Sequence, residues 1–404
     1  MRNLNSLSEK VITKMEDKLT IRNWMSLIGL TCSTFIFNTS EFIPIGLLTD
    51  IARDFAITDT KAGMLISVYA FAVMILSLPL MILVSRFELK KLISSVILVF
   101  AVFQISSAMS TSYVMLMISR IGVACSHAIF WSIVAPLAVR TVPTQFKNVA
   151  LSMIATGTSI AMIFGLPIGR IIGLQIGWRM TFLYIGIFAF ALIIYLLSVL
   201  PIVPSRGNFS LHKLPILLKR PALSRLFVLA FAVATSYYTG YSYIEPFLKQ
   251  IAGMQDSWIT ATLMIFGGMG ILGSLCFSKF YSINPFRFMS IAILSLCGCL
   301  ILLHASSFHS VTIILLCALW GMTFTASNVT LQAETINCSP LDATAVSTSI
   351  FSGLTNLGIA CGTYIGGTVY THFSLSGIGY VGGILALLTF IYWIKRVVPA
   401  MKNK

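Results

Sequence analysis

Charged residues are scarce in this chain, and acidic residues are the scarcest of them. Only 10% of its 404 residues are charged, and 12 acidic residues stand against 27 Lys and Arg. A soluble domain carries about a quarter charged residues, so the composition excludes an ordinary soluble protein. A hydrophobic share of 57% and a mean hydropathy of +0.93 predict instead a helical protein that crosses a membrane several times.

Sequence patterns for several chemistries are missing as well. The sequence has no glycine-rich phosphate loop, no cluster with metal-ligand spacing and no recognisable nucleophile set. We therefore expect no cofactor, no ATP hydrolysis and no enzymatic reaction. The eight cysteines lack zinc spacing and are interpreted as small buried side chains. The basic residues flank apolar stretches rather than forming one stripe, which argues against nucleic acid as a partner.

Long apolar runs are what the sequence has in abundance, and they come in two groups of six. They predict an all-α membrane protein of 12 transmembrane helices in two pseudo-symmetric six-helix bundles. The expected spans cover residues 24–48, 63–84, 92–110, 113–137, 148–173, 178–200, 226–248, 258–280, 287–305, 311–333, 345–371 and 377–395. The expected domains are a cytoplasmic N-terminal segment (1–23), an N-terminal bundle (24–200), a cytoplasmic linker (201–225), a C-terminal bundle (226–396) and a cytoplasmic tail (397–404).

The placement of Lys and Arg predicts how these spans are oriented. Arg120 falls inside a span, and the side opposite the termini receives only Arg53, Lys61, Arg170, Arg179 and Lys249. All other basic residues lie on the side of the termini, so the positive-inside rule places both termini in the cytoplasm. We expect a multi-pass protein surrounded by lipid and functional as a monomer, because one chain could form a complete pathway.

Three ionisable residues inside the apolar spans are the first candidates for function. Glu41 and Glu245 occupy nearly the same place in the first and seventh spans, and Arg120 lies in the fourth. An ionised side chain at the bilayer centre costs about 2.5–3.5 kcal/mol on insertion scales, so each must be neutral, paired or beside water. Glu41 and Arg120 lie at similar depth, and we expect them to form a buried pair. All three are interpreted as proton-coupling residues. For Glu41 and Arg120 the alternative is a purely structural salt bridge, and for Glu245 it is a gate residue.

Polar and aromatic residues at depth are candidates for substrate binding. They are Asn38, His127, Trp131, Tyr237, Tyr241, Asn328, Gln332 and Asn356. His127 follows Arg120 on the same helix face, and Tyr237, Tyr241 and Glu245 share a face of the seventh span. Packing and interhelical hydrogen bonds are the alternative for each of them. Pro246 is expected to break or kink the helix beside Glu245.

Three short motifs resemble the major facilitator superfamily, in particular its drug/proton antiporter branch. Leu116-x-x-x-Arg120-x-Gly122-x-Ala124 resembles the fourth-helix motif whose Arg is associated with proton coupling. Gly157…Gly165-x-Pro167-x-Gly169 is similar to the fifth-helix antiporter motif, although Arg170 stands where a second Gly is usual. Gly177-Trp178-Arg179-x-x-Phe182 resembles the opening of the sixth helix.

Longer segments are similar to the sugar efflux transporters of this branch. They are Phe37-Asn-Thr-Ser-Glu41-Phe-Ile-Pro-Ile-Gly-Leu-Leu, Arg120-Ile-Gly-Val-Ala…His127-Ala-Ile-Phe-Trp131-Ser and Tyr241-Ser-Tyr-Ile-Glu245-Pro-Phe. The resemblance implies an exporter of sugars or sugar-like molecules in the bacterial cytoplasmic membrane, driven by proton antiport through alternating access. A multidrug/proton antiporter with the same machinery is the nearest alternative. An intramembrane enzyme using Glu41 and His127, or a passive channel, would be different classes of protein.

Overall fold

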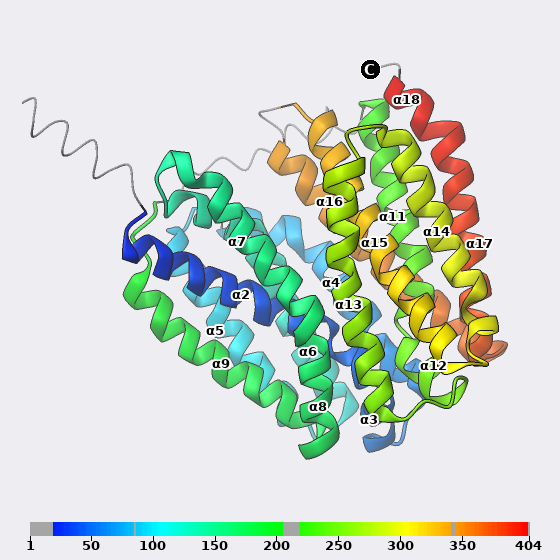
Figure 1. Ribbon diagram of the computed structural model, residues 1–404. Coiled ribbons are helices and arrows are strands. Elements are labelled where there is room, and N and C mark those ends of the chain that lie inside the picture. The colour runs from blue at the N-terminus through cyan, green and yellow to red at the C-terminus, as the bar shows by residue number, and fades with distance from the viewer. Residues whose placement is uncertain (1–18, 85, 205–218, 341–343, 403–404) are drawn as a thin grey trace, which may run out of the picture.

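The protein is a bundle of long helices arranged in two halves (Figure 1). The computed structural model describes residues 19–84, 86–204, 219–340 and 344–402. The N-terminal half contains α2 (Ile21–Gly46), α3 (Leu48–Asp54), α4 (Asp59–Val84), α5 (Leu89–Ala108), α6 (Tyr113–Arg140), α7 (Lys147–Ile160), η2 (Ala161–Gly165), α8 (Leu166–Ile176) and α9 (Trp178–Val199). The C-terminal half contains α11 (Pro221–Tyr241), α12 (Ile244–Gln250), α13 (Asp256–Phe280), α14 (Pro285–Ser306), α15 (Ser310–Cys338), α16 (Thr344–His372), α17 (Ile378–Tyr392), η5 (Trp393–Val397) and α18 (Val398–Lys402).

The expected membrane-spanning architecture is confirmed. Among the described residues, ten helical segments are long and apolar enough to cross a membrane. With α2 and α16, of 26 and 29 residues, the part of the chain that the structure describes holds twelve membrane-length segments. Every described residue belongs to a helix, a turn or an irregular connection, as expected for an all-α protein.

The helix boundaries differ from the expected spans mainly at the ends. Helix α2 begins at Ile21, where Thr20 and Asn23 form a reciprocal cap, and α11 begins at Pro221 rather than at 226. Proline is favoured in the first turn of a helix because its missing N–H is not needed there. Most of the expected N-terminal segment (1–18) and of the linker (205–218) lies outside the described residues.

Interruptions within membrane segments position the site residues. Helices α2 and α3 are separated at Leu47, and α11 and α12 at Ser242 and Tyr243. The expected break beside Glu245 is confirmed, because Pro246 lies in the first turn of α12. A π-helical turn, η2, separates α7 from α8 just before Pro167. A proline clashes with the preceding turn, which favours such local rearrangement of the hydrogen bonds.

The two halves meet near one end of the bundle. We call the end that holds α3 and α12 the α12 end, and the opposite end, where α2 begins and α18 ends, the terminal end (Figure 1). The buried core of the C-terminal half continues into the N-terminal half through Ile45, Leu48, Ile66 and Leu166. The closest contacts between the halves are made by α4 with α16 and by α13 with η2 and α8.

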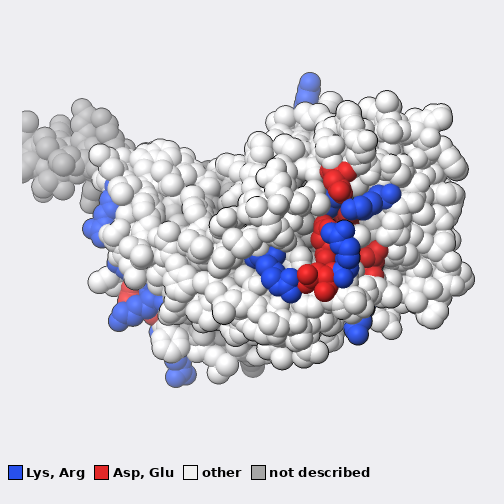
Figure 2. All heavy atoms as spheres, turned by 90° about the horizontal axis from the view of Figure 1, so that it is seen from below, with Lys and Arg blue, Asp and Glu red and all other residues white. Residues whose placement is uncertain are grey.

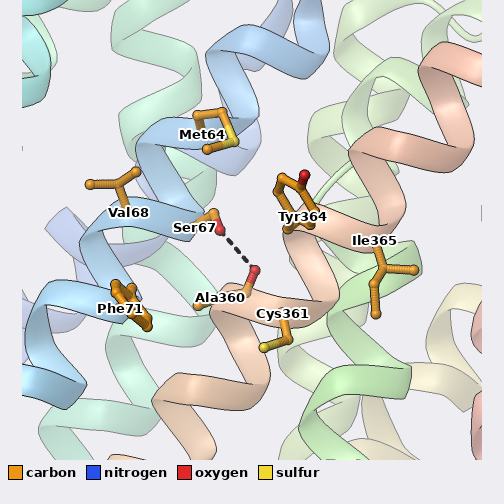
Figure 3. A pocket seen from close by; sticks show the side chains of 8 residues that line it. All are labelled: Met64, Ser67, Val68, Phe71, Ala360, Cys361, Tyr364 and Ile365. Carbon is orange, nitrogen blue, oxygen red and sulfur yellow. Dashed lines mark hydrogen bonds between the residues drawn. The ribbon is translucent and has the colours of Figure 1, made fainter.

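A cavity marks the seam between α4 and α16. Ser67 donates a hydrogen bond to the carbonyl of Ala360 across this seam, at 2.8 Å. Beside that bond, side chains of both helices, among them Phe71 and Tyr364, line a space of about 360 Å³ (Figure 3). Phe71 and Tyr364 are 47% and 59% exposed, so the cavity opens on the outside of the bundle.

Candidate functional site

A carboxylate and an imidazole lie side by side in the N-terminal half. Glu41 on α2 and His127 on α6 approach to 3.5 Å between Oε2 and Nε2, and their side chains are 10% and 3% exposed. Arg120, which precedes His127 by two turns on α6, is 1% exposed. Helices α2 and α6 therefore bring three of the expected site residues into one buried group.

Ser40, rather than Glu41, holds Arg120. The guanidinium donates from Nη1 to the Ser40 hydroxyl and from Nη2 to the Ser40 carbonyl, both at 3.1 Å. The expected direct pair between Glu41 and Arg120 is not formed. Adjacent residues on a helix do not face the same way, so an arginine that reaches Ser40 leaves the next side chain free to turn towards His127.

Two further side chains, which the sequence analysis missed, complete this group. The Arg120 guanidinium lies 4.5 Å from the ring centre of Tyr69 on α4, and Gln104 on α5 donates to the Ser40 hydroxyl. The Tyr69 hydroxyl and His127 Nδ1 are buried and have no hydrogen-bond partner among the described residues. Buried polar atoms are rarely left unpaired, so the group offers a donor and an acceptor to a bound molecule.

Asn38 and Trp131 lie one helical turn from Glu41 and His127, on α2 and α6. Asn38 donates to the carbonyl of Thr34 and to the hydroxyl of Thr158 on α7, at 3.1 and 3.3 Å. The Trp131 ring centre lies 5.9 Å from that of His127. Asn38 is thus engaged with its own half, whereas the Trp131 ring packs beside the imidazole.

Tyr237 and Tyr241 belong to a separate aromatic cluster in the C-terminal half. Their rings stack at 4.8 Å, and each also stacks on a phenylalanine. The cluster comprises Tyr237, Tyr238, Tyr241, Phe266, Trp320 and Phe324, from α11, α13 and α15. Both tyrosines are less than a tenth exposed, so in this conformation their rings pack against one another.

The three expected amides lie on α15 and α16 without forming one group in this conformation. Asn328 is half-buried, and Gln332, one turn nearer the terminal end, is exposed. Asn356 donates to the carbonyl of Ser352 one turn earlier, at 3.0 Å, while its Oδ1 is buried without a partner among the described residues. Asn356 therefore resembles Tyr69 and His127 in having spare hydrogen-bonding capacity.

The glycines of the antiporter-like motif let the fifth span approach α2 closely. A Cβ added to Gly157 would meet the carbonyl oxygen of Thr31 at 2.5 Å. A Cβ at Gly165 or Gly169 would collide with side chains of α2. Pro167 lies in the first turn of α8. The motif thus shapes the contact of η2 and α8 with α2, a packing role that glycines commonly have in membranes.

A cluster of charges joins the two halves at the α12 end. Arg170 of α8 and Glu245 of α12 are both fully buried and lie 3.3 Å apart. Arg170 also pairs with Asp256 of α13 at 2.8 Å and donates to the carbonyl of Gly46. Glu245 accepts from the hydroxyl of Thr49 at 2.8 Å and from its backbone N–H at 3.3 Å. Every one of these contacts except that with Gly46 crosses from one half to the other.

More polar contacts surround this cluster on the same face. Lys249 pairs with Asp256 at 3.1 Å, and Asp59 accepts from Gln250 and Tyr370 of the other half at 2.8 and 3.0 Å. Figure 2 shows acidic and basic side chains interleaved across the middle of the face at the α12 end. Charges of opposite sign therefore meet where the halves converge.

Glu41 and Glu245 do not occupy matching places in the two halves. Glu41 lies before the break at Leu47, towards the middle of the bundle, whereas Glu245 lies beyond the break at Ser242 and Tyr243. Glu245 therefore belongs to the contact between the halves and Glu41 to the buried group. Arg170 lies within an expected span, 148–173. The cost of a charged side chain inside a span, which singled out Arg120, applies equally to Arg170 and could have pointed to this cluster.

Comparison with known proteins agrees with this architecture. A bacterial homolog of the human lysosomal transporter Spinster, in an inward-facing and unoccupied conformation, is similar with a TM-score of 0.78 and 14% identity over 96% of this chain and 99% of that chain. The same homolog in an occupied conformation gives 0.65 and 15% over 95% and 96%. A mutant of the nucleoside transporter NupG gives 0.75 and 14% over 91% and 99%.

At such identities these likenesses establish the fold alone. The family model described as Major Facilitator Superfamily matches residues 30–352, which is most of the chain. The chain therefore belongs to the Major Facilitator Superfamily.

Proposed function

We propose that this protein exports sugars or sugar-like molecules across the bacterial cytoplasmic membrane by proton antiport. In this proposal the termini are cytoplasmic, because basic residues gather on their side. The terminal end then faces the cytoplasm and the α12 end faces outward. The observation that carries the proposal is the buried pair of Glu41 and His127, with Arg120 held beside it by Ser40.

Glu41 is the proposed proton carrier. An ionised carboxylate at membrane depth is costly unless it is compensated, so Glu41 keeps a proton when the site is dry and releases it when water or a cation reaches it. His127 can pass that proton on, because a neutral imidazole has one donor and one acceptor nitrogen. Arg120 contributes positive charge next to the pair without binding the carboxylate, since Ser40 takes two of its donors.

Hydroxyl groups of a sugar could pair with buried polar atoms that lack hydrogen-bond partners in both halves. The Tyr69 hydroxyl, His127 Nδ1 and Asn356 Oδ1 are buried without hydrogen-bond partners among the described residues. A hydroxyl both donates and accepts, so a polyol can satisfy such atoms from either half. Trp131 supplies an aromatic face beside the imidazole.

The structure supports alternating access with the α12 end closed. Arg170, Glu245 and Asp256 link the halves at this end, and we propose that they form the outer gate. Opening to the outside would separate these charges and expose them to water. Protonation of Glu41 would then shift the balance between the closed and the open arrangement, because the proton would bind the two arrangements with different free energies.

A multidrug/proton antiporter remains the second candidate, and the aromatic cluster favours it. Tyr237, Tyr241 and Phe266 present a continuous set of rings in the C-terminal half. If these rings separate in another conformation, they could bind a flat lipophilic cation through cation–π contacts. The two candidates share the proton site and differ only in the molecule transported.

Transport by purified protein in liposomes tests the proposal. An imposed pH gradient should drive uptake of a labelled galactoside by the wild type, and Glu41→Gln should abolish this uptake while galactoside exchange without a gradient survives. Asp54→Asn is the matched control, because Asp54 pairs with Arg179 inside one half at 2.6 Å. This control variant should transport as the wild type does.

Two outcomes would contradict parts of the proposal separately. Gradient-driven uptake that persists in Glu41→Gln would remove Glu41 from proton coupling. A wild type that moves a labelled lipophilic cation, but no galactoside under any gradient, would replace the sugar by a drug-like substrate.

A further inference from the structure

A second cavity lies on the C-terminal half, between α13 and α14 near the terminal end. Its volume is about 350 Å³, within the range of small-ligand sites. Ala292 of α14 and Thr323 and Ala326 of α15 are buried lining residues, whereas Phe280 and Ile291 are 46% and 57% exposed. The cavity is therefore a groove on the side of the bundle with small residues deep inside and large apolar residues at its edges.

Glycine contacts explain why the groove exists. A Cβ on Gly273 or Gly321 would collide with backbone of the facing helix, so α13 lies very close to α15. A Cβ on Gly379 would meet the carbonyl of Leu300 at 2.5 Å, so α14 lies close to α17. Helix α14 also packs on α15, whereas α13 and α14 make few contacts with each other. A gap remains between them, with α15 behind it.

The length of the groove along α14 matches the thickness of one leaflet of a bilayer. Its lining extends along α14 from Asn284, at the N-cap, to Ser295. At 1.5 Å per residue this distance is about 16 Å, and half of the hydrocarbon core is about 15 Å. The side chains along this path are mainly apolar, including Ile291 and Phe288. An acyl chain that enters at the terminal end would fit along it.

The mouth of the groove is positively charged. Arg287 lines it, and Lys279 lies nearby at the end of α13 with its ammonium 5.5 Å from the ring centre of Phe280. Both cationic side chains are exposed. Glu334 of α15 is buried, accepts a hydrogen bond from Tyr281 at 2.7 Å and does not line the cavity.

We propose that this groove binds an anionic phospholipid of the leaflet at the terminal end. One acyl chain lies between α13 and α14, and the headgroup phosphate contacts Arg287 and Lys279. Basic pockets between membrane helices on the cytoplasmic side bind anionic headgroups for this electrostatic reason. The site lies on the outside of the C-terminal half and uses none of the residues assigned to proton coupling, to the outer gate or to substrate binding.

Native mass spectrometry of the full chain with added lipid tests this proposal. Dioleoyl-phosphatidylglycerol and dioleoyl-phosphatidylcholine are titrated separately, so that the headgroup charge alone differs. The wild type should bind one phosphatidylglycerol with clear preference. Arg287→Gln should weaken that first binding step about fivefold, the effect of one basic residue near an anionic surface, and should leave phosphatidylcholine unchanged.

A matched variant separates a specific site from general surface charge. Lys91→Gln removes an exposed cation at the terminal end of the other half and should leave the first phosphatidylglycerol as tightly bound as in the wild type. Equal losses in Lys91→Gln and Arg287→Gln would overturn the proposal, as would equal affinity of the wild type for the two lipids. Ala292→Leu, a substitution deep in the groove, should reduce binding of both lipids, and unchanged binding in this variant would also overturn the proposal.

Discussion

The buried pair of Arg170 and Glu245 should determine how firmly the α12 end stays closed. The substitution Glu245→Gln keeps the shape of the side chain and an acceptor for Thr49, but it removes a negative charge 3.3 Å from Arg170. At an effective dielectric constant of about 20, two unit charges at that distance attract by about 5 kcal/mol. Desolvation offsets much of this attraction, and Asp256 still faces Arg170, so we expect a net loss of about 2 kcal/mol.

This loss applies only while the halves are together at this end, because the separated groups would face water. A change of about 2 kcal/mol is about thirtyfold in the ratio of open to closed molecules. Spin labels at Lys61 and Ser257, exposed positions near the starts of α4 and α13, report this ratio by pulsed electron paramagnetic resonance. Measurements at several pH values serve to find conditions in which both the closed and the open molecules are populated. In Glu245→Gln the fraction of molecules with the longer distance between the labels should increase.

The control is a charge pair at the same end that does not cross between the halves. Asp54→Asn breaks the contact with Arg179 at the same end and should leave the distance distribution unchanged. If Glu245→Gln gave the wild-type distribution, or if both variants shifted it equally, the reasoning that this buried pair holds the halves together would be refuted.

Three further predictions concern single contacts. Gly362→Ala should lower the melting temperature of the purified protein by several degrees, because the new Cβ would lie 2.5 Å from a carbonyl of α11, whereas Gly298→Ala, which has open space around it, should not. Arg120→Lys should reduce gradient-driven transport more than tenfold with little change in melting temperature, since an ammonium cannot reproduce the two parallel bonds to Ser40; near-normal transport would contradict this role. Ser67→Ala removes one hydrogen bond between the halves, which is worth about 1 kcal/mol, and should change the ratio of open to closed molecules only about fivefold. A change as large as that in Glu245→Gln would contradict the conclusion that the charge pair contributes more than this hydrogen bond.

The membrane architecture could be predicted from the sequence because it depends on consecutive residues. A run of apolar side chains of sufficient length must cross the bilayer as a helix, whatever lies beside it. The break beside Glu245 followed equally from a local cause, the proline at 246. The candidates Glu41, Arg120 and His127 were found by their cost at membrane depth, and helices α2 and α6 do bring them together.

The pairing of these side chains follows from helix packing and could not be predicted from depth. Arg120 and Glu41 were expected to pair from their depth alone, yet the rotation of α2 presents Ser40 to Arg120 and Glu41 to His127. Arg170 and Glu245, far apart in the sequence, meet because two halves converge at the α12 end. A helical membrane protein with costly polar groups inside could be recognised from the chain alone, since length and polarity are local properties of consecutive residues. The partners of those groups depend on how the helices rotate and pack against one another, which no local property specifies.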